Sequence, residues 1–394
     1  MPARVFFSGV DPFETRTAGA ARAPRGGVVR RLVHVFGPED PFRPRSVALD
    51  QGRIVFGRAA PATYLLQGDE HASRRHAELS YVPDYDVLRV KDLGSKNGTF
   101  VDGRPLEAYA EHLRNGSILG VGESLFAFEE LEVPAPISAD LLEYCPLDMS
   151  LARFAAEFLV DRAAPTGLPV LIRGPTGAGK EALARRVHEV SGRSGPLVSV
   201  NCASFTRDLL ASELFGHVRG AYSGAEVERK GVFQAAAGGT LFLDEFAEMP
   251  LEQQPALLRA LQEHRIRPVG ADADVHVDVR LVAATHQDVD ALEREGRLRG
   301  DLLARLAGIV VELPGLRLRK VEVLPLFHEL LGRFVPLSSE AAAGLLVHSW
   351  PKNVRELKRY ADTVRLFLGE ADLVDVSLLP AELRPSRPRA ESPS

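Results

Sequence analysis

The stretch that decides the fold is VLIRGPTGAGKEALARRVHEV, residues 170–190. Its apolar start is typical of a buried strand, its end is typical of an amphipathic helix, and the turn between them fits the pattern G-x-x-x-x-G-K. Glycines let backbone N–H groups curl around phosphates, and the helix N-terminus adds partial positive charge. We therefore predict a nucleotide-phosphate site at Gly174, Pro175, Thr176, Gly177, Ala178, Gly179, Lys180 and Glu181.

Two carboxylates complete this site in the sequence. The segment GGTLFLDE, residues 238–245, is an apolar strand that ends in Asp244 and Glu245. A parallel sheet would place that strand end beside the glycine-rich turn. Asp244 is then expected to hold Mg²⁺ and Glu245 to orient or activate the attacking water, while Lys180 reaches the β- and γ-phosphates of ATP. Glu181 stands where many P-loops have a metal-binding hydroxyl, so the metal must depend on other ligands.

Two regions of the chain differ in their hydrophobic pattern. Short apolar or alternating runs punctuated by Gly, Pro, Asp and Asn fill residues 28–132 and predict an all-β sandwich. From residue 141 strands alternate with amphipathic helices, which predicts an α/β domain with a parallel sheet over 141–315. A helical lid is expected over 316–383. The remaining segments are interpreted as a mobile arm at 1–27, a linker at 133–140 and a disordered tail at 384–394.

The composition excludes several classes of protein. The 394 residues are 45% hydrophobic and 26% charged, an ordinary globular balance, and no apolar run is long enough for a membrane helix. Two cysteines, Cys145 and Cys202, exclude a disulfide framework and indicate a reducing cytoplasm. A formal charge of -5 is poor for general binding to nucleic-acid phosphates.

Besides the glycine-rich turn, five motifs of the chain resemble those of the sigma-54-dependent transcriptional activators, a branch of the AAA+ ATPases. They occur in the order of that family and cover about 141–383. The motifs are VNCAS at 200–204, ELFGHVRGAYSGA at 213–225, GGTLFLDE at 238–245, VGADADVHVDVRLVAATH at 269–286 and WPKNVREL at 350–357.

The resemblance implies roles for residues at the matched positions. Asn201 is expected to couple the γ-phosphate state to Glu245, and Thr285, with His286 beside it, to be the first sensor. Arg299 and Arg305 are expected to reach into the site of a neighbouring subunit in a ring, expected to be a hexamer, and Arg355 to be the second sensor. A guanidinium supplied in trans would make ATP hydrolysis depend on assembly.

The resemblance also implies a contact loop for the sigma-54 RNA polymerase holoenzyme. The loop is formed by Gly220, Ala221, Tyr222, Ser223, Gly224 and Ala225. Its tip is Tyr-Ser where the family usually has Phe-Thr. Near Arg299 the chain has Leu298 and Gly300 in place of Phe and Glu.

The N-terminal region resembles the forkhead-associated (FHA) domain. The pieces that carry the resemblance are GR at 57–58, SRRH at 73–76, LGSKNGT at 93–99 and VDG at 101–103. The family implies a β-sandwich that binds phosphothreonine peptides through loops at one end, with His76 stabilising a loop. Cations and neutral hydrogen-bonding groups suit a dianionic phosphate. By position the site would comprise Arg58, Ser73, Arg74, Lys96 and Asn97.

Together these patterns predict an ATP-hydrolysing activator of sigma-54 RNA polymerase that is gated by a phosphothreonine-containing protein or a Ser/Thr kinase. The sequence lacks the helix-turn-helix usual in the family, so we expect no sequence-specific DNA binding by this polypeptide. Two alternatives stay open. One is an AAA+ ATPase that remodels another protein, and the other is a phosphopeptide-binding adaptor whose ATPase domain only oligomerises with nucleotide.

Overall fold

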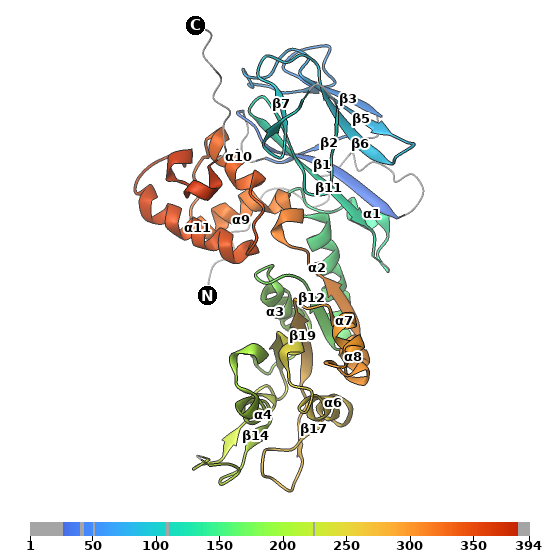
Figure 1. Cartoon of the computed structure of the whole chain (residues 1–394), viewed down its shortest axis with the longest axis vertical. Helices are drawn as coiled ribbons and strands as arrows, with labels where there is room; N and C mark the ends of the chain where they lie inside the picture. The colour runs from blue at the N-terminus through green and yellow to red at the C-terminus, as the bar shows by residue number, and fades with distance from the viewer. Residues whose placement is uncertain are drawn as a thin grey trace. The chain divides into compact units, whose positions relative to one another are not determined.

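The structure is a computed structural model that describes residues 27–39, 43–49, 52–107, 110–134, 136–223 and 225–384 (Figure 1). The arm predicted at 1–27 and the tail predicted at 384–394 lie almost wholly outside the described residues. The chain divides into two compact units. The first joins Met1–Phe154, Leu316–Trp350 and Leu357–Ser394, and the second joins Ala155–Gly315 and Pro351–Glu356.

A β-sandwich, antiparallel except for the short pair β3 and β4, forms the first part of unit one. A six-stranded sheet has the order β2-β1-β11-β10-β7-β8, and a five-stranded sheet has the order β4-β3-β5-β6-β9. Large apolar side chains from both sheets, among them Phe56, Phe126 and Phe128, fill the space between them. The strands are β1 (Val28–Phe36), β2 (Arg45–Val47), β3 (Arg53–Gly57), β4 (Tyr64–Leu65), β5 (Ala77–Val82), β6 (Val87–Asp92), β7 (Thr99–Val101), β8 (Arg104–Pro105), β9 (Glu111–His112), β10 (Ile118–Val121) and β11 (Ser124–Glu132).

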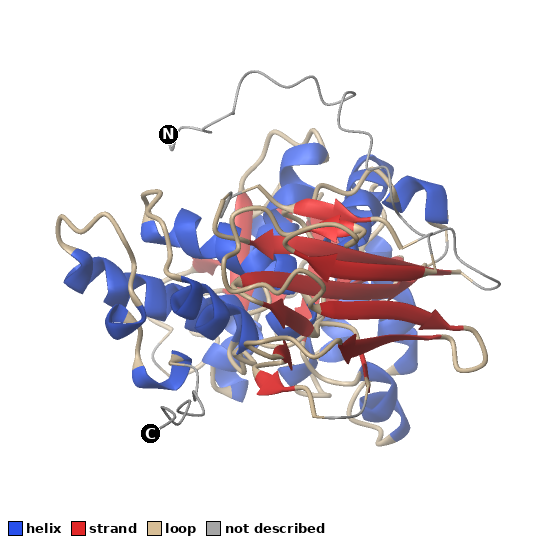
Figure 2. Cartoon of the chain, turned by 90° about the horizontal axis from the view of Figure 1, so that it is seen from above, coloured by secondary structure: helices blue, strands red, loops and turns tan. Residues whose placement is uncertain are grey.

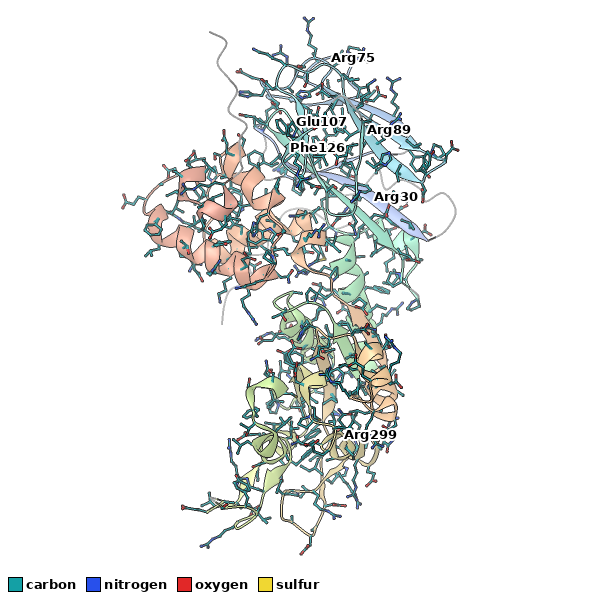
Figure 3. All side chains as sticks on the ribbon, viewed as in Figure 1. Arg30, Arg75, Arg89, Glu107, Phe126 and Arg299 are labelled. Atoms are coloured by element: carbon teal, nitrogen blue, oxygen red, sulfur yellow. The ribbon has the colours of Figure 1, made fainter. Side chains whose placement is uncertain are left out.

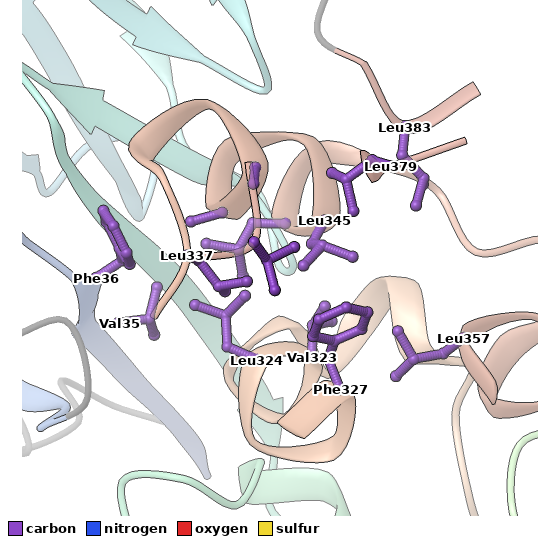
Figure 4. Close-up of a cluster of buried hydrophobic side chains, with 14 of the residues drawn as sticks. Val35, Phe36, Val323, Leu324, Phe327, Leu337, Leu345, Leu357, Leu379 and Leu383 are labelled. Carbon is purple, nitrogen blue, oxygen red and sulfur yellow. The ribbon is translucent and has the colours of Figure 1, made fainter. Parts of the chain in front are cut away.

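The lid forms the second part of unit one. Its helices are α9 (Val323–Leu331), α10 (Ser339–Val347) and most of α11 (Asn353–Leu368). Ser338 begins α10 by accepting a hydrogen bond from the Ala341 N–H, a regular N-cap. The lid core surrounds Trp350, which is 1% exposed. The same buried cluster contains Val35 and Phe36 of the sandwich (Figure 4).

A parallel five-stranded sheet, ordered β13-β16-β19-β12-β20, is the centre of unit two. The apolar runs at 169–172, 197–200, 240–243 and 280–284, from which the sequence predicts strands, form β12 (Val170–Arg173), β13 (Leu197–Asn201), β16 (Thr240–Asp244) and β19 (Arg280–Thr285). A fifth strand, β20 (Ile309–Glu312), was not predicted. Helices pack on both faces of this sheet. Figure 2 shows the helices and strands of the chain in separate colours.

Alternation along the strands explains this layering. On β16, Leu241 and Leu243 belong to one buried cluster and Phe242 to the other. A strand that is buried on both faces is apolar at every position, which is why the sequence signal was strong. The first cluster packs on α4 (Arg207–Phe215), α6 (Gln254–Glu263), α7 (Val289–Arg294) and α8 (Gly300–Leu306), and the second packs on α2 (Leu151–Ala163) and α3 (Lys180–Val190).

Smaller elements complete the described chain. They are α1 (Ala139–Leu142), α5 (Val232–Ala235) and the short strand pairs β14 (Gly216–His217) with β15 (Arg229–Lys230) and β17 (Arg265–Ile266) with β18 (Val275–His276). Short 3₁₀ helices lie at Ala164–Thr166, Cys202–Ser204, Phe246–Glu248, Leu316–Leu318, Lys320–Glu322, Val376–Leu378 and Ala381–Leu383. Within the described residues, none of the helices combines the length and apolarity that a bilayer crossing requires. Both cysteines are buried and free.

Candidate functional site

The glycine-rich turn joins the end of β12 to the start of α3. Gly177 and Gly179 have φ values of 75° and 108°, a region that other residues rarely occupy. A Cβ on Gly174 would lie 2.2 Å from the carbonyl oxygen of Leu313, so this position also requires glycine. The turn therefore presents its backbone at the N-terminus of α3, as expected of a phosphate cradle.

Lys180, Asp244 and Glu245 meet at the carboxyl edge of the sheet. Lys180 is 5% exposed, and its Nζ lies 2.9 Å from the Gly174 carbonyl oxygen and 3.5 Å from Glu245 Oε1. Burial, followed by the charge of Glu245, raises the pKa of Asp244 above its usual range. Two neighbouring carboxylates beside a buried ammonium form a site that favours an added cation.

His286 holds the other oxygen of the Glu245 carboxylate. Its Nδ1 lies 2.7 Å from Glu245 Oε2, and its backbone N–H donates to the same oxygen at 3.3 Å. Glu245 itself has φ 51°, an uncommon conformation for a non-glycine residue. The sequence placed His286 only beside the first sensor. Its contact with Glu245 follows from the position of each residue just past the end of a neighbouring strand, β19 and β16.

We predict that His286→Ala lowers the ATPase rate by up to about 100-fold. Without His286, the Glu245 carboxylate can shift by a fraction of an ångström and no longer orients the attacking water. His286→Asn, which keeps a short hydrogen-bonding side chain, should recover part of the loss. Steady-state turnover at saturating ATP measures both variants. An unchanged kcat in the alanine variant would contradict the positioning role.

Two further predicted residues lie at the same edge. Asn201 ends β13 opposite Asp244 in the strand register, and its Oδ1 accepts the Ala203 N–H at 2.9 Å. Thr285 is fully buried at the end of β19, and its carbonyl oxygen accepts the Gly174 N–H at 3.1 Å. The fold thus brings both residues to the phosphate cradle, and their coupling and sensing roles stay predictions.

Arg299 and Arg305 lie on the surface at the start and the end of α8. Arg299, labelled in Figure 3, pairs with Asp301 at 2.8 Å, and Arg305 reaches the Leu261 carbonyl at 3.5 Å. Leu298, which replaces a family Phe, is 3% exposed and packs in the adjoining core. Exposed guanidinium groups are available to a neighbouring molecule, and the role in trans remains a prediction.

Arg355 is exposed on the first turn of α11, which lies against the glycine-rich turn. Asn353 Nδ2 donates to the Thr176 carbonyl at 2.9 Å, and the Val354 N–H donates to the Gly177 carbonyl at 2.9 Å. A Cβ on Gly177 would lie 3.2 Å from Arg355 Cβ. The backbone of Arg355, the predicted second sensor, therefore lies next to the glycine-rich turn, and its sensing role stays a prediction.

The residues present fit Mg²⁺ held mainly by nucleotide and water. Among the described side chains, no group of three or more His, Cys, Asp or Glu residues is arranged to enclose a metal ion. Mg²⁺ usually binds through one or two carboxylates together with substrate phosphates. Asp244 is the carboxylate placed for this, because it is half-buried at the strand end beside Lys180.

The predicted contact loop projects between β14 and β15. The Gly220 N–H donates to the Ala225 carbonyl at 2.8 Å, and the Ala225 N–H donates to the Tyr222 carbonyl at 3.0 Å, which closes the turn. Tyr222 is 41% exposed and its ring lies 5.2 Å from that of His217. Ala221 and Ser223 complete the described part of the loop, and Gly224 lies outside the described residues.

The predicted phosphopeptide residues come from three loops at one end of the sandwich. Ser73 connects these loops, because its carbonyl accepts the Arg58 N–H and its Oγ accepts the Lys96 N–H, both at 3.1 Å. Asn97 Nδ2 donates to the His71 carbonyl at 2.8 Å. Arg74 is exposed beside them. All five predicted residues are therefore grouped at these loops.

His76 fixes this loop end from inside, as predicted. It is fully buried, its Nδ1 accepts the Ser73 N–H at 3.1 Å, and its Nε2 donates to the Gly98 carbonyl at 3.0 Å. In contrast, the side chains of Arg58, Arg74 and Lys96 are exposed and have no acceptor among the described residues. Unpaired cations of this kind suit a dianionic phosphate, and the role of these residues in phosphopeptide binding stays a prediction.

The P-loop, the strand-end carboxylates and the helical lid define the AAA+ fold, a class of P-loop nucleotide-binding domains. The sigma-54 interaction domain family matches residues 152–312, the FHA domain family matches 54–122 and the AAA+ ATPase lid domain family matches 321–394. The chain thus combines an FHA domain with the ATPase domain and lid of sigma-54-dependent regulators.

Relatives agree with this assignment. ZraR of Escherichia coli is 45% identical over 217 residues, 52% of this chain and 49% of ZraR. UacR of Escherichia coli, named as a sigma-54-dependent transcriptional regulator, is 40% identical over 319 residues, 78% of this chain and 51% of UacR. The chain spans about half the length of these curated relatives. The structure of NtrX from Brucella abortus with ADP matches with a TM-score of 0.55 at 35% identity, over 62% of this chain and 56% of NtrX.

Proposed function

We propose that this protein hydrolyses ATP to activate sigma-54 RNA polymerase, and that phosphothreonine recognition by its FHA domain gates the activity. The observation that carries the proposal is the meeting of Lys180, Asp244 and Glu245 in a domain that also bears the loop with the exposed Tyr222. The matches to sigma-54 regulators, and the ATP and ADP complexes of NtrX, support it.

The chemistry follows from the positions of the side chains. ATP would lie over the N-terminus of α3 with its β- and γ-phosphates at Lys180. Glu245, held by His286, orients the attacking water and accepts its proton. Mg²⁺, held by Asp244 and the phosphates, would supply charge neutralisation. Arg299 or Arg305 of a neighbouring protomer in a ring would stabilise the developing phosphate charge.

We expect the 220–225 loop to transmit the effect of ATP hydrolysis to sigma-54. In the chain, β13 ends at Asn201 and is followed by α4 and then by the 220–225 loop. A conformational change at Asn201 could therefore pass to the loop through α4. Tyr222 would then press on sigma-54. The Tyr-Ser tip keeps an aromatic ring and a hydroxyl, the two features of the family's Phe-Thr.

The deciding experiment measures ATPase rate against concentration of the full chain, with and without a phosphothreonine peptide, together with open-complex formation by sigma-54 polymerase. Turnover that rises with assembly and responds to the peptide, with open complexes formed, is the expected result. ATPase turnover without any sigma-54-dependent signal would refute the activator role and favour remodelling of another protein.

The FHA part of the proposal has its own prediction. Arg58→Ala should weaken phosphothreonine-peptide binding by about 10- to 100-fold, because one charge-assisted hydrogen bond is worth about 1.5–3 kcal/mol. Arg89→Ala is the matched control, since Arg89 is exposed on β6 away from the three loops (Figure 3). Isothermal titration with phosphorylated and unphosphorylated peptides distinguishes the two. Equal affinities for both variants would remove Arg58 from the site.

A further inference from the structure

The outer face of the sandwich's six-stranded sheet is buried, although such a face usually meets water. Along β11, Phe126 and Phe128 point into the sandwich, whereas Leu125 and Ala127 point away from it and are still at most 8% exposed. Their register partners on β1 are Phe36 and Val33, which are also buried. Something therefore covers this face along both strands.

The cover is the lid. Val33, Phe36, Ile118, Leu125 and Ala127 belong to one buried cluster with side chains of α9, α10 and α11 (Figure 4). The cluster is continuous, so the lid core is completed by the sandwich. Lid residues that share it include Val323, Leu324, Phe327, Leu337, Leu345 and Trp350.

Glycines at the junction show how close the two backbones come. A Cβ on Gly116, in the turn before β10, would lie 2.5 Å from the carbonyl oxygen of Arg317 in the lid. A Cβ on Gly103, in the turn after β7, would lie 3.1 Å from Val347 Cγ1 at the end of α10. Such contacts leave no room for a water layer between sandwich and lid.

A buried polar network ties the connecting segment to both sides. The Arg31 guanidinium, on the same outer face, donates to Glu129 at 2.6 Å and to the carbonyls of Cys145, Pro146 and Met149. From the lid, Glu322 accepts hydrogen bonds from the Ser150 N–H and hydroxyl at the start of α2. The segment 145–150 is therefore held by charged groups of the sandwich and of the lid.

We propose that the FHA sandwich is a permanent structural part of the ATPase lid, joined through the outer face of β1, β11 and β10. A phosphothreonine protein bound at the FHA loops would then be carried by the lid as one rigid body. The connection to nucleotide is α11, because its first turn contacts the glycine-rich turn and its remaining turns lie in the shared core. This inference deepens the regulation in the proposed function and rests on it for that last step.

A disulfide across the junction tests the proposal. The Cβ built on Gly103 lies 3.8 Å from Val347 Cβ, and disulfides have Cβ–Cβ distances of about 3.5–4.5 Å. In the full chain, Gly103→Cys with Val347→Cys should cross-link readily on oxidation, detected by non-reducing gel and peptide mass. The ATPase rate and the peptide response of the oxidised chain should stay within about twofold of those of the reduced chain.

Gly52→Cys with Val347→Cys is the matched control. Gly52 shares the positive φ of Gly103, at 67° against 76°, but nothing lies within 4 Å of its Cβ position. This control should not cross-link. Equal yields in both pairs, or no cross-link at Gly103, would overturn the packing. A cross-link that stops turnover until reductant is added would overturn the rigid-body motion.

Hydrogen exchange on the unmodified chain keeps the test independent of ATPase activity and of any folding defect. Amides of α9 and α10 should open in the same cooperative step as those of β1 and β11. Lid amides that exchange much faster than the strands would contradict the shared core. If the chain had no ATPase activity, the cross-link yield and the exchange pattern would still report on the junction.

Discussion

Glu245→Gln is expected to reduce ATP turnover by about 10²- to 10⁴-fold, the contribution typical of a positioned general base. The amide keeps the size of the carboxylate and its place beside His286, but it cannot take a proton from water. It also removes a negative charge 3.5 Å from Lys180, so ATP should bind at least as tightly as to the parent chain. Turnover assays and equilibrium binding of a fluorescent ATP analogue separate the two effects.

Glu248→Gln is the matched control for this prediction. Glu248 follows Glu245 on the same short turn, is exposed, and pairs with Gln287 at 2.5 Å. The same chemical change there should leave turnover within about twofold, since the group lies outside the water's reach. If Glu245→Gln retained more than a tenth of the parent rate, the assignment of Glu245 as the base would be wrong. Loss of nucleotide binding would instead indicate misfolding.

The α/β half of the fold was predictable largely because its three central strands, β12, β16 and β19, are buried on both faces. Each of β12, β13, β16 and β19 is a short, mostly apolar run, and three of them carry a candidate site residue at the last position: Asn201, Asp244 and Thr285. β20 (Ile309–Glu312) was missed because its inner and outer positions alternate in burial, as expected for an edge strand. Its β-branched run, Ile309–Val311, is only three residues long.

The contacts that matter most to function were not readable from local sequence. His286 and Glu245 meet because β16 and β19 are neighbours in the sheet, a consequence of strand order. The burial of β11 on its outer face had a clue in the consecutive apolar residues 125–128. Consecutive apolar residues indicate that both faces of β11 are buried. They do not identify what covers the outer face, because the covering helices come about 200 residues later in the chain.

Arg31→Ala gives the largest expected loss of stability, about 3–5 kcal/mol, because removing one partner of a buried ion pair leaves the other charge unpaired. Arg31 and Glu129 are 4% and 2% exposed. Three backbone carbonyls also lose their donor. The exposed pair of Arg53 and Glu78 on the other sheet supplies the control, and Arg53→Ala should cost at most about 1 kcal/mol.

Trp350 makes this prediction specific to the junction between sandwich and lid. It is the only tryptophan in the chain and is buried in the shared core, so its fluorescence reports unfolding of the lid. An Arg31→Ala change in the sandwich should therefore lower the denaturant midpoint of the Trp350 signal strongly, whereas Arg53→Ala should lower it by at most about a third as much. Replacing Arg31 with Met and Glu129 with Leu should recover only part of the loss, because the carbonyls of the 145–149 segment stay without a donor. If Arg31→Ala left the denaturant midpoint of the Trp350 fluorescence unchanged, the lid would fold independently of the sandwich.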